Sequence, residues 1–191
     1  MGLEERKESR ILVTMEIVIR DLDRYNDVDF GQCDNSFTVK SKLILRAEDG
    51  RISYTIVDVP PYIKSYGVER TDYAEYADSF NHNICFAYIN EELTGQTHVQ
   101  SYWNKYAYIS DLIVDTKYRR QGVGRALIEH NIQWAQAKGL SGIVLETQNN
   151  NVAACKFYES CGFELRGFDT HLYKGLNPAT DEIALYWYLI F

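Results

Sequence analysis

Long apolar runs and a secretory leader are both missing from this sequence. No stretch approaches the ~20 apolar residues that a transmembrane helix needs, so the chain is expected to stay out of the membrane. The first ten residues alternate in charge and lack the apolar core of a leader peptide. A soluble, cytoplasmic protein is therefore expected.

Metal-binding and linker patterns are missing as well. No zinc-site spacing of histidine and cysteine accompanies any cysteine, so free thiols and no bound metal are expected at Cys33, Cys85, Cys155 and Cys161. There is no repeat, no low-complexity tract and no linker rich in Pro, Gly or Ser. A chain of 191 residues suits one core better than two, which predicts a single domain over residues 1–191 with an N-terminal extension over 1–35.

Basic residues are the minority among the charged ones, with 20 Lys and Arg against 27 Asp and Glu and a net charge of −7. Nucleic-acid binding requires clustered Lys and Arg to neutralise phosphates, so no nucleic-acid partner is expected. The negative charge suits a cationic ligand, although it also favours solubility. The 15 tyrosines leave two uses open, a polar-edged aromatic pocket or amphipathic strand positions.

Turn signals and apolar patterns predict strands through the first half of the chain. The Asp-Gly pair at 49–50 predicts a hairpin turn, and the two prolines at 60–61 are expected to end the strand that follows. A polar helical segment is expected over 71–78 and a turn over 91–95. The four predicted strands cover residues 37–45, 52–57, 84–89 and 97–103.

The second half of the chain alternates strands with helices. Apolar spacing predicts a helix over 123–138, which Gly139 ends, and a second helix over 151–161, which Gly162 ends. Strands are predicted around them at residues 106–114, 142–147, 163–168 and 183–191. This order predicts an α/β layer, and the hairpins that precede it make the sheet a mixed one.

A glycine-rich turn joins the strand that ends at Val114 to the helix that begins at Val123. The free N–H groups of a helix start can bind an anion, and Gly122 and Gly124 carry no side chain that would keep a diphosphate away. Neither a Walker loop nor a dinucleotide fingerprint is present. The segment predicts an anion site formed by Arg119, Arg120, Gln121, Gly122, Val123, Gly124 and Arg125.

Two motifs, in this order, resemble those of the GNAT acetyltransferases. One is Arg119-x-x-Gly122-x-Gly124, and the other is Asn-x-x-Ala-x-x-Phe-Tyr-Glu-x-x-Gly-Phe over 151–163. The resemblance implies acetyl-CoA as co-substrate, bound by a core over 106–168. It also implies a mostly antiparallel sheet, flanked by helices, that splits in a V between its fourth and fifth strands. The pantetheine arm would meet a strand edge and a helix face formed by Leu112, Ile113, Val114, Asn151, Ala154, Phe157 and Tyr158.

Acetyl transfer from a thioester to an amine needs a proton acceptor and a proton donor. By resemblance, Tyr158 faces the sulfur and protonates the departing thiolate. Glu146 lies near the end of a buried strand, where a carboxylate requires a wet cleft or a partner, so it is a candidate base. Tyr108, Ser110 and Asp111 on the preceding strand are alternatives, and Glu146 could instead bind the substrate ammonium group.

Further segments from about Val59 to the C-terminus are similar to streptothricin acetyltransferases, which acetylate the β-lysine arm of a cationic antibiotic and confer resistance. These segments are residues 61–66, 104–109, 145–150, 154–158, 169–170 and 187–189. Where the family pattern has a glutamate before the aspartate of the fourth-strand motif, this chain has Ser110, so more weight falls on Asp111 and Glu146. Aromatic residues expected beside the cleft suit an ammonium ligand or hairpin packing, namely Tyr102, Trp103, Tyr106 and Tyr108.

The expected substrate is a small cationic amine, with streptothricin implied by the resemblance. Two other functions stay open: acetylation of a protein lysine or N-terminal amine, which needs an open groove, and non-catalytic binding of acyl-CoA. Glu146 and Tyr158 argue against the second, because binding alone does not require them. The protein is expected to be a monomer or a homodimer.

Overall fold

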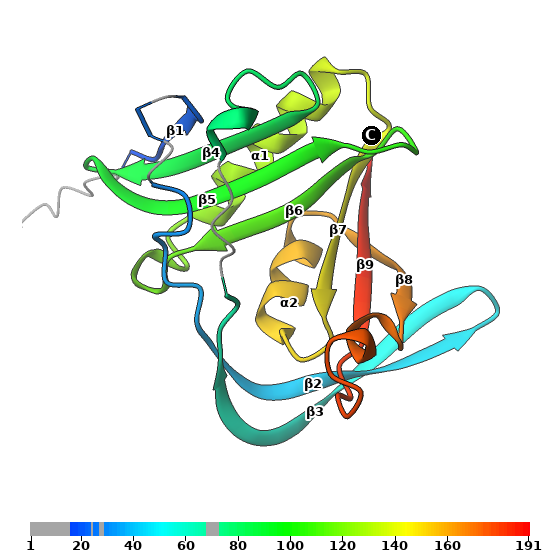
Figure 1. The fold of residues 1–191 in the computed structure, drawn as a ribbon. Helices are drawn as coiled ribbons and strands as arrows, with labels where there is room; N and C mark the ends of the chain where they lie inside the picture. Colours follow the sequence, from blue (N-terminus) through cyan, green and yellow to red (C-terminus); the bar gives the residue numbers. More distant parts are fainter. Residues whose placement is uncertain (1–15, 24, 27–28, 68–72) are drawn as a thin grey trace, which may run out of the picture.

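The strands gather in two sheets, seven in one and two in the other (Figure 1). The structure is a computed structural model that describes residues 16–23, 25–26, 29–67 and 73–191. The expected mixed α/β fold is confirmed. In spatial order, the larger sheet contains β1 (Val18–Asp21), β4 (His82–Ile89), β5 (Glu92–Ser101), β6 (Ala107–Val114), β7 (Gly142–Gln148), β9 (Ala184–Ile190) and β8 (Glu164–Asp169).

The pairing of β6 with β7 is parallel, whereas all other neighbours in the larger sheet are antiparallel. A parallel pair needs a crossover, which α1 (Val123–Ala137) supplies. The pairing covers only 107–109 and 143–145, and beyond these residues the two strands separate. The V between the fourth and fifth strands of the sheet is therefore confirmed.

Two helices flank this sheet, each beside one part of the V (Figure 1). The apolar side of α1 packs on β4, β5 and β6 and buries Val123, Leu127 and Ile128 completely. The shorter α2 (Val152–Ser160) lies beside the region where β6 and β7 diverge. Among the described residues, no helix has the length and apolar character required to cross a membrane.

The smaller sheet is a long curved hairpin of β2 (Phe37–Glu48) and β3 (Arg51–Lys64). Asp49 and Gly50 both adopt positive φ, as a tight hairpin turn requires. The prediction that the prolines end the second strand is wrong, because β3 continues to Lys64. The register shifts at Lys40, opposite residues 59–61, which forms a bulge. Residues in a bulge do not all pair across the strands, so the missing N–H of a proline there costs no hydrogen bond between β2 and β3.

Two other predicted boundaries also differ. The turn expected over 91–95 is formed by Asn90 and Glu91, both with positive φ, and Gly95 lies inside β5. A Cβ at Gly95 would lie 2.8 Å from the Ile113 carbonyl oxygen, so glycine serves close strand packing there. The helical segment expected over 71–78 appears as a 3₁₀ helix, Tyr73–Tyr76, while 71–72 lie outside the described residues.

Candidate active site

The V leaves one edge of β6 without a neighbouring strand. Beyond Ile109 this edge no longer pairs with β7, while the other edge continues to pair with β5 as far as Val114. A register shift between His98 and Val99 bulges β6 at Ser110, whose hydroxyl donates to the His98 carbonyl at 3.3 Å. Apart from the Val114 carbonyl, which accepts from Arg119, the groups of residues 112–114 on this edge have no partner in the described part of the chain and are open to an extended ligand that adds as a strand.

The glycine-rich turn lies at the start of α1, as expected. Gly122 is the N-cap residue with φ of 93°, and no side chain of the described residues caps the first turn, so its N–H groups can accept a ligand. A Cβ at Gly124 would lie 3.0 Å from Phe157 Cζ and 3.4 Å from Val114 Cγ2. This glycine therefore also permits the close approach of α1, α2 and β6.

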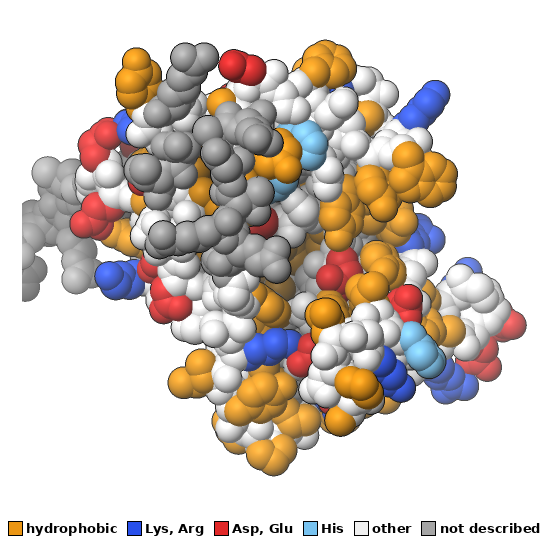
Figure 2. All heavy atoms as spheres, in the orientation of Figure 1, with side chains coloured by type: hydrophobic (Ala, Val, Ile, Leu, Met, Phe, Trp, Pro, Cys, Tyr) orange, Lys and Arg blue, Asp and Glu red, His pale blue; other side chains and the backbone are white. Residues whose placement is uncertain are grey.

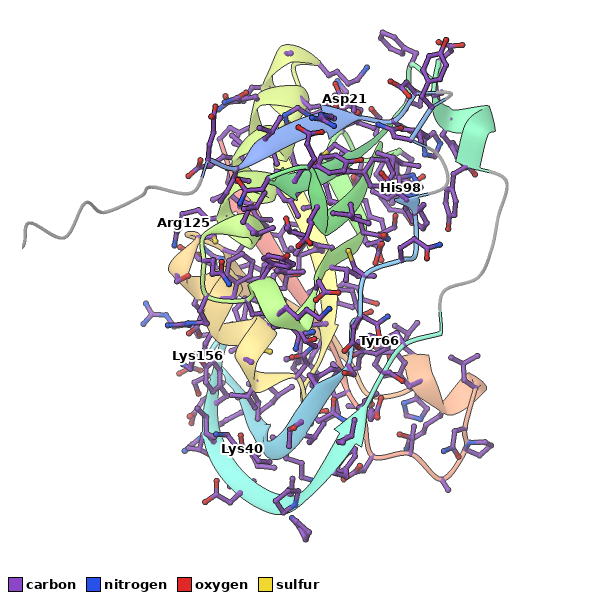
Figure 3. The ribbon with its side chains drawn as sticks, turned by 90° about the vertical axis from the view of Figure 1, so that its left-hand side faces the viewer. Asp21, Lys40, Tyr66, His98, Arg125 and Lys156 are labelled. Carbon is purple, nitrogen blue, oxygen red and sulfur yellow. The ribbon has the colours of Figure 1, made fainter. Side chains whose placement is uncertain are left out.

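The side chains of the loop differ in how they are used. The Arg119 guanidinium donates to the carbonyls of Val114 and Ser36 at 3.1 and 2.7 Å. Gln121 donates to the Lys117 carbonyl, and Arg125, labelled in Figure 3, donates to Ser160 of α2. Arg120 is exposed, and its guanidinium has no partner in the described part of the chain.

Tyr158 combines deep burial with a free hydroxyl group. Asn151 caps α2 by accepting from the Ala154 N–H at 3.2 Å, and the helix brings Tyr158 to a position where it is 7% exposed and packs edge-on against Phe163. Its hydroxyl forms no hydrogen bond with any described residue. Burial and the nearby Asp111 carboxylate raise the pKa of Tyr158, so the phenol holds its proton at neutral pH.

Two carboxylates stand on opposite walls of the opening. On β6, burial raises the pKa of Asp111 to about 6 although Gln96 donates to its Oδ2 at 2.5 Å. On β7, burial raises the pKa of Glu146. The Tyr173 hydroxyl, which donates to the Glu146 carboxylate, and the charge of Lys64 lower it in part. Both are suited to accept a proton or to bind an ammonium group.

The remaining wall comes from segments far from the GNAT-like motifs. Tyr66, just after β3, donates to the Gln148 side chain, and Tyr173 belongs to the 3₁₀ helix Leu172–Gly175. Lys64 pairs with Glu182 at 2.6 Å. In Figure 2, carboxylate and hydrophobic side chains, a class that includes tyrosine there, lie side by side in the middle of this face. The wall thus joins aromatic and acidic groups.

The four aromatic residues expected beside the cleft do not form one cluster. The Tyr102 ring stacks on Tyr108 at 5.5 Å, and burial together with Glu146 raises the pKa of Tyr108 to about 12. Trp103 is 84% exposed, and Tyr106 packs edge-on against Tyr188. Of these four residues, Tyr108 and the Tyr102 ring stacked on it lie near Glu146.

Sequence reasoning gave no role to three side chains that contact the site carboxylates or their strands: Gln96, Tyr66 and Tyr173. Gln96 and Tyr173 lie outside every motif, so the sequence contains no signal for them. Tyr66 ends one of the segments that resemble streptothricin acetyltransferases, which was the available clue.

A group of possible metal ligands lies elsewhere. Asp21, Cys85 and His130 place their ligand atoms within 4.8 Å of one another, and the His130 Nε2 lies 2.8 Å from Asp21 Oδ1. Strands β5 and β6 separate this group from the opening. All four cysteines are free, as expected.

Comparison with known proteins places this geometry in a family. Residues 53–163 match the model of the Acetyltransferase (GNAT) family. Streptothricin acetyltransferase from Escherichia coli is 37% identical over 156 residues, which are 81% of this chain and 86% of that protein. Streptothricin acetyltransferase A from Bacillus subtilis (strain 168) is 34% identical over 175 residues, 91% of this chain and 100% of that protein.

A solved structure agrees with these matches. It is a crystal structure of a candidate streptothricin acetyltransferase from Bacillus anthracis str. Ames in complex with acetyl coenzyme A. Its TM-score is 0.85 at 46% identity, over 93% of this chain and 99% of that one. The open strand edge, the uncapped helix start and these likenesses lead to one conclusion. The chain belongs to the GNAT family of acetyltransferases and is an acetyl-CoA-dependent N-acetyltransferase.

Proposed function

We propose that this enzyme acetylates an amino group on the β-lysine arm of streptothricin and thereby confers resistance to that antibiotic. The observation that carries the proposal is Tyr158, whose ring is buried and whose hydroxyl has no partner among the described residues, in an opening whose two walls present Asp111 and Glu146. Carboxylates and tyrosines together suit an ammonium-bearing substrate. Relatives that bear the name streptothricin acetyltransferase, and that align with most of this chain, support the choice of substrate.

Acetyl-CoA would bind along α1, β6 and α2. We assign its diphosphate to the N–H groups at Gly122, Val123 and Gly124, with Arg120, which has no partner among the described residues, as a nearby cation and with Arg119, Gln121 and Arg125 shaping the loop. The pantetheine amides would pair with the open β6 edge at Leu112, Ile113 and Val114. Its other side would face Asn151, Ala154 and Phe157 on α2.

In the reaction, the amine nitrogen attacks the thioester carbonyl carbon and the carbon–sulfur bond breaks. The amine loses a proton and the sulfur gains one. We assign the second transfer to Tyr158, whose burial keeps its proton in place until a thiolate forms beside it. Because the same dry surroundings raise the pKa of a thiol, donor and acceptor remain matched.

The proton of the amine would pass to Glu146, directly or through water, while Asp111 holds the ammonium group before reaction. Both carboxylates have raised pKa values, as a base that works near neutral pH requires. Tyr108 and Ser110 complete the β6 wall and would contact the substrate. Kinetics separate the roles: Asp111→Asn should mainly raise KM for the amine, and Glu146→Gln should mainly lower kcat.

An expression experiment tests the proposal. A sensitive bacterium that produces this chain should survive streptothricin, and the recovered drug should be heavier by one acetyl group on its β-lysine arm. The same strain with Tyr158→Phe at equal protein level is the control and should be more sensitive. Survival without acetylated drug, or death with abundant folded protein, would refute the assignment of the substrate.

A further inference from the structure

A buried glutamine on β5 holds the Asp111 carboxylate. Gln96 is 0% exposed, its Nε2 donates to Asp111 Oδ2 at 2.5 Å, and its Oε1 accepts from the Gly31 backbone N–H at 2.7 Å. The partners fix the orientation of the amide, because a carboxylate can only accept and an N–H can only donate. One side chain thus joins the segment around Gly31 to a site carboxylate.

The main chain of Asp111 is held from the other face of the sheet. The Thr97 hydroxyl donates to the Asp111 carbonyl at 2.9 Å and accepts from Asn131 of α1 at 3.0 Å. Both Thr97 and Asn131 are fully buried. Because Asp111 follows the bulge at Ser110, these contacts fix its position where β6 has separated from β7 but still pairs with β5.

The two sets of contacts leave one carboxylate oxygen free. Oδ2 is bound by Gln96, whereas Oδ1 has no hydrogen-bond partner among the described residues. A carboxylate tied through one oxygen cannot rotate freely, so the other oxygen keeps one direction at little entropic cost on binding. The charge of the Asp111 carboxylate also raises the pKa of Tyr158, so the carboxylate lies within electrostatic range of the proposed proton donor.

We propose that Gln96 is a positioning residue for the amine substrate, because it holds the free oxygen of Asp111 toward the substrate ammonium group. The inference rests on the proposed function, which assigns the ammonium group to Asp111. A buried glutamine is suited to this role because its two ends serve the carboxylate and the Gly31 N–H at once. The hydrogen bond that Gln96 donates also lowers the pKa of Asp111 and so reduces the rise caused by burial.

Gln96→Met removes both hydrogen bonds at nearly constant volume. KM for streptothricin should rise about tenfold, since the charge-assisted contact through Asp111 loses its fixed geometry. KM for acetyl-CoA should stay unchanged. The acid limb of the kcat/KM profile should move to higher pH, because Asp111 protonates more easily without its donor. A role in folding alone would leave that limb in place.

Tyr88→Phe is the matched control. It removes the partly buried hydrogen bond from Tyr88 to Asp29, in the same segment as Gly31, and leaves Gln96 and Asp111 untouched. KM and the pH profile should match the wild type. If Tyr88→Phe reproduces the effects of Gln96→Met, docking of the segment explains them and the inference is wrong.

A double-variant comparison isolates the dependence on Asp111. In an Asp111→Asn background, Gln96→Met should change KM for streptothricin no further. If Asp111→Asn has an effect and Gln96→Met has none, the positioning role fails while the proposed function stands. If Asp111→Asn itself leaves KM and the pH profile unchanged, the proposed ammonium site fails, and with it the inference.

Carbon NMR gives a readout that requires no substrate. The Asp111 carboxyl signal, identified by its loss in Asp111→Asn, should titrate at higher pH in Gln96→Met than in the wild type. If Gln96→Met does not fold, Gln96→Glu replaces it, because it keeps the acceptor for Gly31 and must share a proton with Asp111, which also moves the titration upward. An unchanged titration in the folded variant refutes the role of Gln96.

Discussion

Two polar side chains of this site have a hydrogen-bonding atom that no other described residue binds. Among the described residues, the Tyr158 hydroxyl has no hydrogen-bond partner and Asp111 is bound through one oxygen only. Neither free atom is among the buried side-chain atoms without a partner, so both are open to a ligand that completes their hydrogen bonding. The proposed chemistry uses the groups that the protein leaves unsatisfied.

Tyr158→Phe should lower kcat by about 100-fold, the usual scale of general acid help. The ring and its packing against Phe163 are kept, and the lost hydroxyl has no protein partner in the described part of the chain. Thermal unfolding should therefore be unchanged, which separates lost chemistry from lost structure. Wild-type kcat in a folded variant would show that water or another group protonates the sulfur.

Asp111 should destabilise the fold at neutral pH. Its folded pKa of about 6 lies above the ordinary value of 3.8, so the folded state binds its proton more tightly and loses stability as pH rises from about 4 to 6. Asp111→Asn removes this dependence. The free energy of unfolding of the variant, relative to wild type, should rise by on the order of 2 kcal/mol from pH ~4 to pH ~7. Urea unfolding at both pH values measures it, and a constant difference contradicts the burial argument.

The two neighbouring arginines of the loop should respond differently. Arg119→Gln removes hydrogen bonds to two carbonyls and should lower the free energy of unfolding by roughly 1–3 kcal/mol. Arg120→Gln should leave stability unchanged and raise Kd for acetyl-CoA roughly 5-fold, less at high salt. Calorimetry and thermal unfolding test both. Equal effects of the two variants would contradict the division of roles.

Motifs revealed some of these residues and not others. Tyr158 and the loop glycines stand in patterns whose spacing is short, so the sequence pointed to them. Gln96 contacts Asp111 from the neighbouring strand, and Tyr173 contacts Glu146 from a segment far along the chain. The first contact depends on the register of β5 against β6, and the second depends on where the segment of Tyr173 packs. Neither can be predicted from a local sequence pattern. The side chain of Arg119 was expected at a phosphate and instead holds backbone carbonyls.

Among the elements, the contact of α1 with α2 also constrains the glycine-rich loop. Gly124 lies where a Cβ would come within 3.0 Å of the Phe157 ring. The glycine thus serves two purposes, access to the helix start and packing between helices. A substitution at Gly124 is therefore expected to change helix packing as well as any binding of the cofactor.

Gly124→Val should lower both affinity for acetyl-CoA and stability. Overpacking against Phe157 should lower the free energy of unfolding by roughly 1–3 kcal/mol. Adding Phe157→Leu should restore part of the stability, because it removes the ring, but not the affinity. Calorimetric binding and urea unfolding of the three proteins test this. Unchanged affinity in the folded variant would remove the diphosphate from the loop.

Helix and strand positions after residue 106 agree with the sequence prediction to within about two residues. Strong apolar spacing and glycine stops defined those elements. The boundary failures lie in the first half, at the prolines of β3 and at the Asn90–Glu91 turn, and strand β1 was not predicted at all. A bulge accommodates the first, and close packing of Gly95 on β6 explains the second. Both depend on a partner strand, which the local sequence does not reveal.

For the whole molecule, the hairpin completes the site. Leu43 of β2 exchanges hydrogen bonds with Asn149 after β7, at 2.9 and 3.2 Å, and Tyr66 follows β3. In Figure 3, Tyr66 and His98 lie on one side of the molecule, and Arg125 and Lys156 on the other. The same V thus has a side for the proposed cofactor loop and a side for the proposed amine.

The proposed activity of this V is the transfer of acetyl groups to streptothricin. The most direct measurement is kcat/KM of the purified protein with acetyl-CoA for streptothricin and, in parallel, for a lysine peptide, with the product masses determined. The proposed function predicts rapid release of CoA and a singly acetylated antibiotic, with kcat/KM for the peptide at least 100-fold lower, about 2.7 kcal/mol of discrimination. Efficient acetylation of the peptide and none of streptothricin would contradict it, and no acetylation of either would favour acyl-CoA binding without catalysis.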